Sequence, residues 1–270
     1  QRAAATGHIK SQDRLAQMPE VEPFKVAPPT KNDTPKAEPK QTVPIPTSQF
    51  PPGYSNQTVT WVADRLEPHR IRGFGSGFAL SSEGVIATNE HVIDGCKEIF
   101  AVYQSKPKRA QLLFANQAHD FAVIKISAKT PSFFFLKSSA PLLGEELTSG
   151  GYPSPDTLGA GIKITTGVVS SEGPRTGEQF QHTTPSQPGN SGGPLINSAG
   201  YVVGISTAVY GENIGELAPQ NINFAVSEKT IRHNLKKWNL RFSEGTASLQ
   251  FPTTLLADML KRSTAQIICY

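Results

Sequence analysis

Ser191 is surrounded by glycines in the segment QPGNSGGPLI, which covers residues 187–196. A serine that only completes a turn does not need glycines on both sides, whereas a serine that attacks a carbonyl does. The backbone must then come within about 3 Å of the developing oxyanion, and flanking side chains would block that approach. Glycine also adopts the unusual dihedral angles of a tight nucleophile loop. The segment therefore predicts a nucleophilic serine, which needs a base and a group that orients the base.

His91 is the strongest candidate for the base. It follows the apolar run 85–88 within the segment VIATNEHVI, so the end of a rigid element would hold the imidazole. The other histidines lie in a polar tail, in a turn, in strand-like segments or on a late helix: His8, His69, His119, His182 and His233. Of these, His182 is near Ser191 in sequence, but strand alternation favours a structural role for it.

Asp120 is the candidate for the orienting group. It opens the apolar run DFAVIKI, where a carboxylate is costly unless it is hydrogen-bonded, for example to an imidazole N–H. Taken singly, Asp120 also fits a strand-start residue and His91 a buried core histidine. Together, His91, Asp120 and Ser191 occur in one of the known orders of a Ser-His-Asp triad, at separations of 29 and 71 residues.

Many short apolar runs with Gly and Pro between them predict a β barrel or sandwich. The expected strands are 76–80, 85–88, 98–103, 110–114 and 121–126, followed by 146–152, 162–170, 180–183, 195–196, 202–207 and 222–226. These two groups predict two packed halves, with a substrate cleft between them. Two late amphipathic helices are expected: one starts at Ser227 and places Ile231, Leu235 and Trp238 on one face, and the other covers 254–262.

The segment before the strands has a different composition. Prolines at 19, 23, 28, 29, 35, 39, 44, 46, 51 and 52 exclude helix and sheet, so residues 1–55 are expected to be a flexible, Pro-rich spacer. A proline-rich ligand for a partner domain is the alternative. We therefore expect a folded domain over residues 56–240 and a C-terminal extension, 241–270, that packs on it.

The composition bears on partners and cofactors. The net charge is +4, without a basic stripe interleaved with aromatic residues, which argues against a nucleic-acid partner. No metal-ligand cluster is visible, so no metal or other cofactor is expected. The longest apolar runs are too short to span a membrane. Cys96 and Cys269 are expected to be free thiols, although a bond between them remains an alternative.

Four motifs in this order resemble the trypsin-like peptidases, above all their bacterial Deg/HtrA-like branch. The motifs are GSGF at 75–78, TNEHV at 88–92, DFAVIK at 120–125 and PGNSGGPL at 188–195, and the segments GVVS at 167–170 and INFAV at 222–226 are similar to later strands of that branch. The resemblance implies an all-β fold of two six-stranded antiparallel barrels with a C-terminal helix. It also implies His91 as general base, Asp120 as orienting group, Ser191 as nucleophile, and the amides of Gly189 and Ser191 as the oxyanion hole.

Some residues depart from that pattern. Asn190 stands where the digestive enzymes have an aspartate, which argues against activation by a newly cut N-terminus. The chain after Trp238 is too short for the PDZ domain that is usual in the branch. Ser206, Thr207 and Asn223 are the candidate specificity residues, and they are expected to accept a small or medium side chain.

The sequence therefore predicts a serine endopeptidase, a hydrolase that acts on polypeptides. A catalytically latent domain that binds peptides, and an esterase with the same chemistry, are the competing interpretations. By analogy with the branch, the expected location is the bacterial periplasm or the outside of the cell. The oligomeric state does not follow from the sequence.

Overall fold

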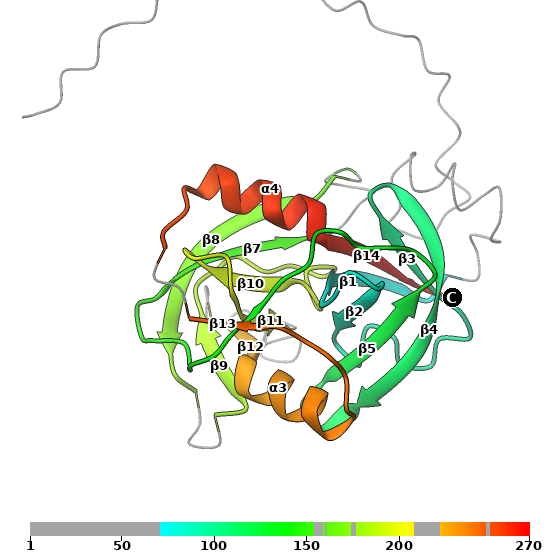
Figure 1. The fold of residues 1–270 in the computed structure, drawn as a ribbon, viewed down its shortest axis with the longest axis horizontal. Helices are drawn as coiled ribbons and strands as arrows, with labels where there is room; N and C mark the ends of the chain where they lie inside the picture. The colour runs from blue at the N-terminus through cyan, green and yellow to red at the C-terminus, as the bar shows by residue number, and fades with distance from the viewer. Residues whose placement is uncertain (1–70, 154–158, 160, 174–176, 208–221, 247–248) are drawn as a thin grey trace, which may run out of the picture. The chain divides into compact units, whose positions relative to one another are not determined.

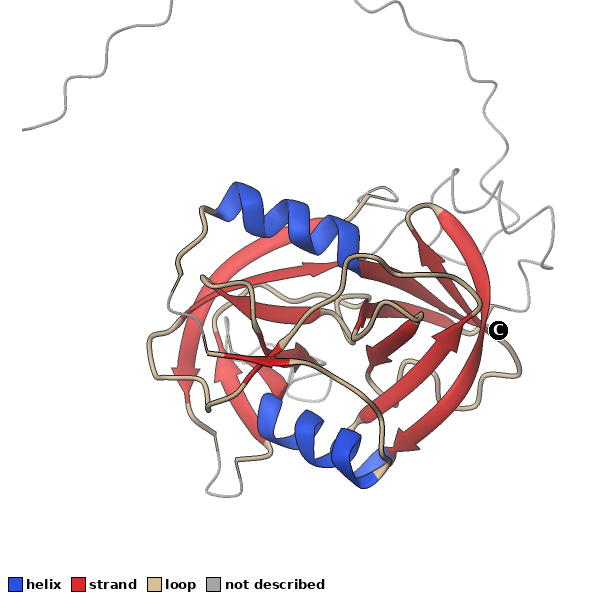
Figure 2. Cartoon of the chain, viewed as in Figure 1, coloured by secondary structure: helices blue, strands red, loops and turns tan. Residues whose placement is uncertain are grey.

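The computed structural model describes residues 71–270, apart from 154–158, 160, 174–176, 208–221 and 247–248. All of them belong to the second of two units of the chain, Ile45–Tyr270. The predicted spacer, residues 1–55, lies outside the described part. Figure 2 shows that strands dominate this unit, with a helix on each of two opposite sides. This arrangement confirms the predicted all-β class.

The first half is a closed, six-stranded antiparallel barrel in the order β1-β14-β3-β4-β5-β2 (Figure 1). Its strands are β1 (Gly73–Ala79), β2 (Val85–Thr88), β3 (Ile99–Tyr103), β4 (Lys106–Asn116), β5 (Phe121–Ile126) and β14 (Thr264–Cys269). The five strands nearest the N-terminus form where apolar runs predict them. The sixth comes from the C-terminal end of the chain, where no strand is predicted.

β14 closes the barrel by pairing with strands on both of its sides. Ala265 pairs with Tyr103 of β3, and Cys269 pairs with both Gly73 of β1 and Ile99 of β3. All six of its residues are buried. Because its polar residues are buried as well as its apolar ones, the strand has no exposed polar face that would reveal it in the sequence.

The prediction of free thiols is wrong, because Cys96 and Cys269 form a disulfide. The pairing of Cys269 with Ile99 brings the end of β14 to the start of β3. Cys96 lies three residues before Ile99, so β14 places its sulfur beside a cysteine 173 residues away in sequence. The long-range pairing of β14, which the sequence does not reveal, creates this contact.

The second half is also a six-stranded antiparallel barrel, and the pairing of β10 with β11 closes it. Its strands are β7 (Glu146–Gly151), β8 (Lys163–Ser171), β9 (Gln179–His182), β10 (Pro194–Asn197), β11 (Val202–Ser206) and β12 (Asn223–Ser227). Two short parallel strands extend from β11, namely β6 (Leu136–Lys137) and β13 (Glu244–Gly245). The two-barrel prediction is confirmed.

Helix α3 (Glu228–Lys237) covers β11 and β12, and helix α4 (Thr253–Ser263) covers β7. As predicted, the first helix begins after Ser227, whose hydroxyl accepts a hydrogen bond from the Thr230 amide. Ile231 and Leu235 are fully buried. Trp238 ends α3, remains 52% exposed and packs against Phe114 of the first barrel at 4.7 Å between ring centroids. No helix of the described residues is long and apolar enough to cross a membrane.

The two barrels share a hydrophobic core where they meet. Phe78 and Phe121 of the first barrel belong to the same buried cluster as Ile196 and Ile205 of the second. Since Ile196 lies five residues after Ser191, this shared core holds the nucleophile loop against the first barrel. The junction is therefore a rigid place for a site.

Candidate active site

His91 and Asp120 meet on the first barrel. His91 lies in the turn after β2, and its Nδ1 is 2.8 Å from Oδ1 and 2.9 Å from Oδ2 of Asp120. The His91 backbone N–H also donates to Oδ1 at 3.0 Å. The carboxylate thus binds both the ring and the backbone of the same histidine, which fixes the orientation of the imidazole.

Asp120 is held from several sides. It caps the short 3-10 helix Gln117–His119 in a left-handed conformation (φ 46°), which aspartate tolerates better than most residues. Thr207 of the second barrel donates its hydroxyl to Oδ2 at 2.6 Å. Burial raises the pKa of Asp120, but the hydrogen bonds and charge of His91, together with the Thr207 hydroxyl, outweigh it and lower the pKa below its ordinary value. The carboxylate is therefore ionised at neutral pH.

The loop around Ser191 is a series of tight turns. The Asn190 N–H donates to the Gln187 carbonyl at 2.9 Å, and Gly189 has φ +99°, so Pro188 and Gly189 occupy the central positions of a type II turn. A Cβ on Gly189 would lie 2.6 Å from the Tyr152 carbonyl oxygen. The glycine predicted to allow a close backbone approach is thus required both by its dihedral angle and by its surroundings.

Asn89 connects this loop to the His91–Asp120 pair. Its side-chain amide donates to the Asp120 carbonyl at 2.8 Å, and its Oδ1 accepts from the Gly192 N–H at 2.6 Å. Asn89 is fully buried and stands two residues before His91, while Gly192 directly follows Ser191. The structure therefore brings the three segments of the predicted triad together at the junction of the barrels.

Sequence reasoning missed the roles of Asn89 and Thr207. Both are polar residues at the junction of the barrels, and Asn89 lies within the TNEHV motif itself. Polar side chains inside a buried-looking run are a signal of such contacts, because they need hydrogen-bond partners there.

The three candidate specificity residues lie on the second barrel. The Ser206 hydroxyl is 3.2 Å from that of Ser186, and the Asn223 side chain donates to the Thr184 carbonyl at 3.0 Å. Thr207 has the contact with Asp120 described above. Because residues 208–221 lie outside the described part, a substrate pocket at these residues stays a prediction.

His182 is a core residue of β9. It is fully buried, and its Nε2 lies 3.2 Å from the Phe224 carbonyl oxygen. Burial lowers its pKa to about 4, so the ring is neutral at physiological pH. This environment agrees with the structural role expected for it.

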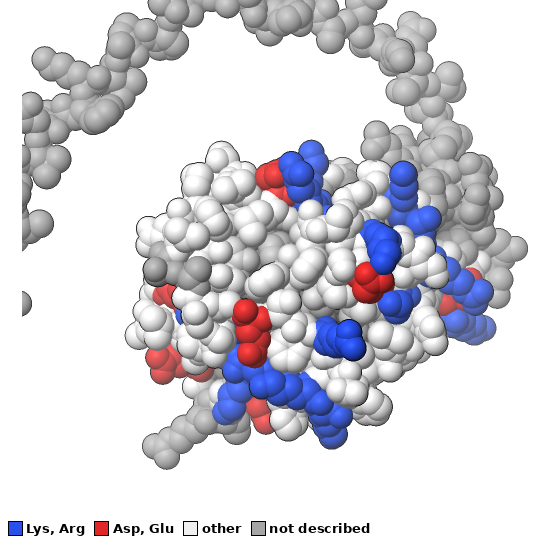
Figure 3. All heavy atoms as spheres, viewed as in Figure 1, with Lys and Arg blue, Asp and Glu red and all other residues white. Residues whose placement is uncertain are grey.

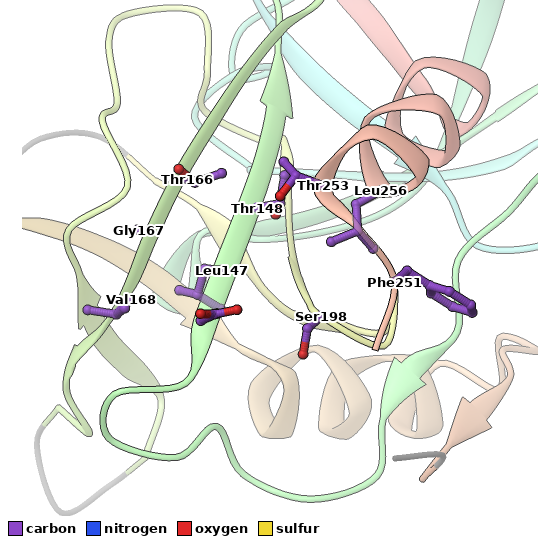
Figure 4. Close-up of a pocket in the computed structure, with 10 residues that line it drawn as sticks. Leu147, Thr148, Thr166, Gly167, Val168, Ser198, Phe251, Thr253 and Leu256 are labelled. Atoms are coloured by element: carbon purple, nitrogen blue, oxygen red, sulfur yellow. The ribbon is translucent and has the colours of Figure 1, made fainter. Parts of the chain in front are cut away.

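A cavity of about 300 Å³ lies between β7, β8 and the start of α4 (Figure 4). Thr148, Thr166, Phe251 and Leu256 are among the residues that line it, and none of the predicted site residues is.

Figure 3 shows Lys and Arg side chains in small separate groups on the face that it draws, with acidic side chains beside several of them. Within the described residues, no cluster of three His, Cys, Asp or Glu side chains could hold a metal ion.

Comparison with known proteins supports the same family. Residues 75–205 match the family model of the trypsin-like peptidase domain. A probable periplasmic DegP-like serine endoprotease of Hahella chejuensis is 34% identical over 169 residues, which are 60% of this chain and 34% of that protein. The crystal structure of a serine endoprotease from Yersinia pestis aligns with a TM-score of 0.55 and 27% identity, over 72% of this chain and 68% of that one.

The HtrA-type protease AlgW, solved with a decapeptide, aligns with a TM-score of 0.53 and 29% identity, over 61% of this chain and 51% of that one. The chain spans about a third of the length of the curated relatives it matches. The family match begins at Gly75 of the GSGF motif and ends within β11, so it includes the candidate triad and most of both barrels. Residues 75–205 of this chain thus match a trypsin-like peptidase domain, and the chain is similar to bacterial DegP/HtrA-like proteases.

Proposed function

We propose that this chain is a serine endopeptidase that cleaves polypeptides through an acyl-enzyme intermediate. The observation that carries the proposal is the hydrogen-bonded His91–Asp120 pair, joined through Asn89 to the loop of Ser191. Relatives named as serine endoproteases support it.

In the proposed reaction, the Ser191 hydroxyl oxygen attacks the peptide carbonyl while His91 takes the hydroxyl proton. The Gly189 and Ser191 amides bind the resulting oxyanion. When the C–N bond breaks, His91 returns the proton to the leaving amine, and an acyl ester remains on Ser191. Water then attacks the ester with His91 as base, which releases the acid and restores the serine. Asp120 stays ionised and keeps the Nδ1 proton of His91 in place.

Substrate choice is proposed to depend on Ser206, Thr207 and Asn223. All three are buried to more than 90%, and the chain there offers hydroxyl and amide groups rather than a carboxylate. Among the described residues, these three side chains suit a small or medium substrate side chain, and none of the three gives an anionic partner for Lys or Arg. A library of peptides that vary at the residue before the cleaved bond tests this preference.

The proposed location is the bacterial periplasm or the cell exterior. Relatives named as periplasmic support it. The Cys96–Cys269 disulfide is a second support, because structural disulfides persist in oxidising compartments. Residues 1–55 are proposed as a spacer and 56–240 as the peptidase domain, with 241–270 as a C-terminal extension that packs on the domain through α4 and completes the first barrel through β14. Since β14 closes the first barrel, removal of 241–270 is expected to prevent folding.

Turnover of unfolded casein tests the function. Wild type is expected to cleave it, Ser191→Ala to leave it intact, and Asp120→Asn to lose on the order of 10³–10⁴-fold in kcat. Ser170→Ala, at an exposed serine of β8, is the matched control and should retain full activity. A folded wild-type protein that binds the substrate without cleaving it would refute the proposal and favour a latent peptide-binding domain.

A further inference from the structure

We propose that Ser76 is a positioning residue of this site, which holds the nucleophile loop in its catalytic conformation before any peptide binds. The inference rests on the proposed peptidase function and adds a residue from outside the triad. It also predicts that the loop keeps this conformation when no peptide is bound.

Ser76 stands in the middle of β1 and is fully buried. Its hydroxyl donates to the Gly189 carbonyl at 2.7 Å and accepts from the Tyr152 N–H at 3.0 Å. Its backbone N–H donates to the Ser191 carbonyl at 2.8 Å. A single residue of the first barrel therefore binds two carbonyls of the nucleophile loop.

Ser76 is itself fixed by its neighbours. The Thr88 hydroxyl of β2 donates to the Ser76 carbonyl at 2.7 Å. Tyr152, which follows β7 of the second barrel, fixes the Ser76 hydroxyl from the other side. Since both barrels hold Ser76, it can act as a rigid reference point for the loop.

The carbonyls of three consecutive loop residues are bound. Ser76 binds those of Gly189 and Ser191, and the Gly193 N–H donates to that of Asn190 at 2.9 Å. In a trans peptide the C=O and N–H point in opposite directions, so a bound Asn190 carbonyl fixes the direction of the Ser191 N–H. This N–H is one of the two proposed oxyanion donors.

The direction of the Gly189 N–H depends on the Ser76 hydroxyl. The peptide unit between Gly189 and Asn190 is held at its carbonyl by Ser76 and at its N–H by the Gln187 carbonyl. With this unit fixed, the dihedral angles of Gly189, whose φ is positive, determine the orientation of the preceding peptide unit and hence the direction of the Gly189 N–H. Without the hydroxyl, the buried carbonyl must find another partner, and its rotation would turn the oxyanion donor away.

Kinetics of Ser76→Ala test the inference. Loss of one oxyanion donor lowers kcat by about 10²–10³-fold in serine peptidases, so a displaced donor is expected to cost about 10–100-fold in kcat, with KM changed less than about threefold. Affinity for a peptide boronic acid, whose oxygen occupies the oxyanion hole, should fall by the same factor as kcat/KM. Affinity for the cleaved product peptide should not change.

Ser227→Ala is the matched control. Ser227 is equally buried, and its hydroxyl also makes two hydrogen bonds to backbone groups, but it caps α3. This variant is expected to melt at a lower temperature and keep its kcat. If Ser76→Ala kept its kcat too, or lost kcat only in proportion to unfolded protein, the proposed positioning role would be refuted.

Hydrogen exchange gives a readout that needs no activity. Without ligand, the wild-type amides of Asn190, Gly192 and Gly193, which donate to backbone carbonyls, are expected to be protected, and Ser76→Ala should exchange there at least about tenfold faster. Should Ser76→Ala not fold, Thr88→Val removes the anchor of Ser76 and should shift exchange and kcat in the same directions. Unprotected amides in the wild type would overturn the proposal. Protected amides in a protein that cleaves no peptide would instead refute only the peptidase function.

Discussion

Reduction of the Cys96–Cys269 disulfide is predicted to remove a large part of the stability of the folded unit. The bond joins the turn that follows His91 to the end of β14, across 173 residues. β14 lies between β1 and β3, so the bond also holds the strand that closes the first barrel. Its loss therefore acts both on the unfolded chain and on the barrel that carries the His91–Asp120 pair.

The magnitude follows from the length of the closed loop. In the chain-entropy account, a cross-link over 173 residues restricts the unfolded chain by about 5 kcal/mol at 25 °C. Residual structure in the denatured state lowers this value, so we expect a measured loss of about 2–5 kcal/mol. Since the unfolding free energy of a protein is only about 5–15 kcal/mol, the reduced protein should unfold at clearly lower urea concentrations.

Urea unfolding with and without a phosphine reductant, followed by circular dichroism, measures the loss. The double variant Cys96→Ser/Cys269→Ser is the matched control. It should unfold with the midpoint of the reduced wild type and be insensitive to the reductant. A loss below about 1 kcal/mol in the wild type, or an equal effect of the reductant on the double variant, would refute the reasoning.

Three further predictions concern single residues. The pKa of His182 is about 4 in the fold and 6.5 in the unfolded chain, so the unfolded chain binds more protons between pH 6.5 and pH 4. As pH falls through this range, wild type should lose about 3 kcal/mol of unfolding free energy. His182→Gln should not show this loss in pH-dependent urea melts. Thr207→Val removes a hydroxyl that helps to lower the pKa of Asp120. A lowered carboxyl pKa contributes stability above the unfolded pKa of 3.8, and this stability is lost as pH falls through the folded pKa. Thr207→Val has less of this stability, so its acid unfolding should begin at a higher pH than that of wild type. An unchanged acid midpoint would contradict this prediction. Gly189→Ala should lower kcat at least about tenfold, whereas Gly144→Ala, also at positive φ but with nothing within 4 Å, should cost stability alone; equal kcat values would show that the Gly189 conformation is unimportant.

Local patterns predict most of the strands and the chemistry. Apolar runs between Gly and Pro identify strands such as β2 and β5, because burial of both faces leaves a continuous apolar signature. The pairing of His91 with Asp120 follows from chemistry, since each polar group at a buried position needs a partner. These features depend on short segments of sequence, so sequence reasoning reaches them.

Long-range pairing is harder to predict. β14 mixes Thr264 and Gln266 with apolar residues and buries all of them, so nothing local marks it as the sixth strand of the first barrel. The disulfide depends on β14, so the sequence offered it only as the alternative to free thiols. The contact of Ser76 with Gly189 spans 113 residues and depends on how the two barrels meet, which no local pattern encodes.

Identification of the residue that a fluorophosphonate labels tests the central claim most directly. The folded protein is incubated with the probe at mildly alkaline pH, digested and analysed by mass spectrometry. Nucleophilic catalysis by Ser191 predicts one adduct per chain, on the peptide that contains Ser191. The adduct should be absent from Ser191→Ala and formed far more slowly by His91→Ala. No adduct on a folded wild-type protein, or an adduct on another residue, would contradict the assignment of Ser191 as the nucleophile.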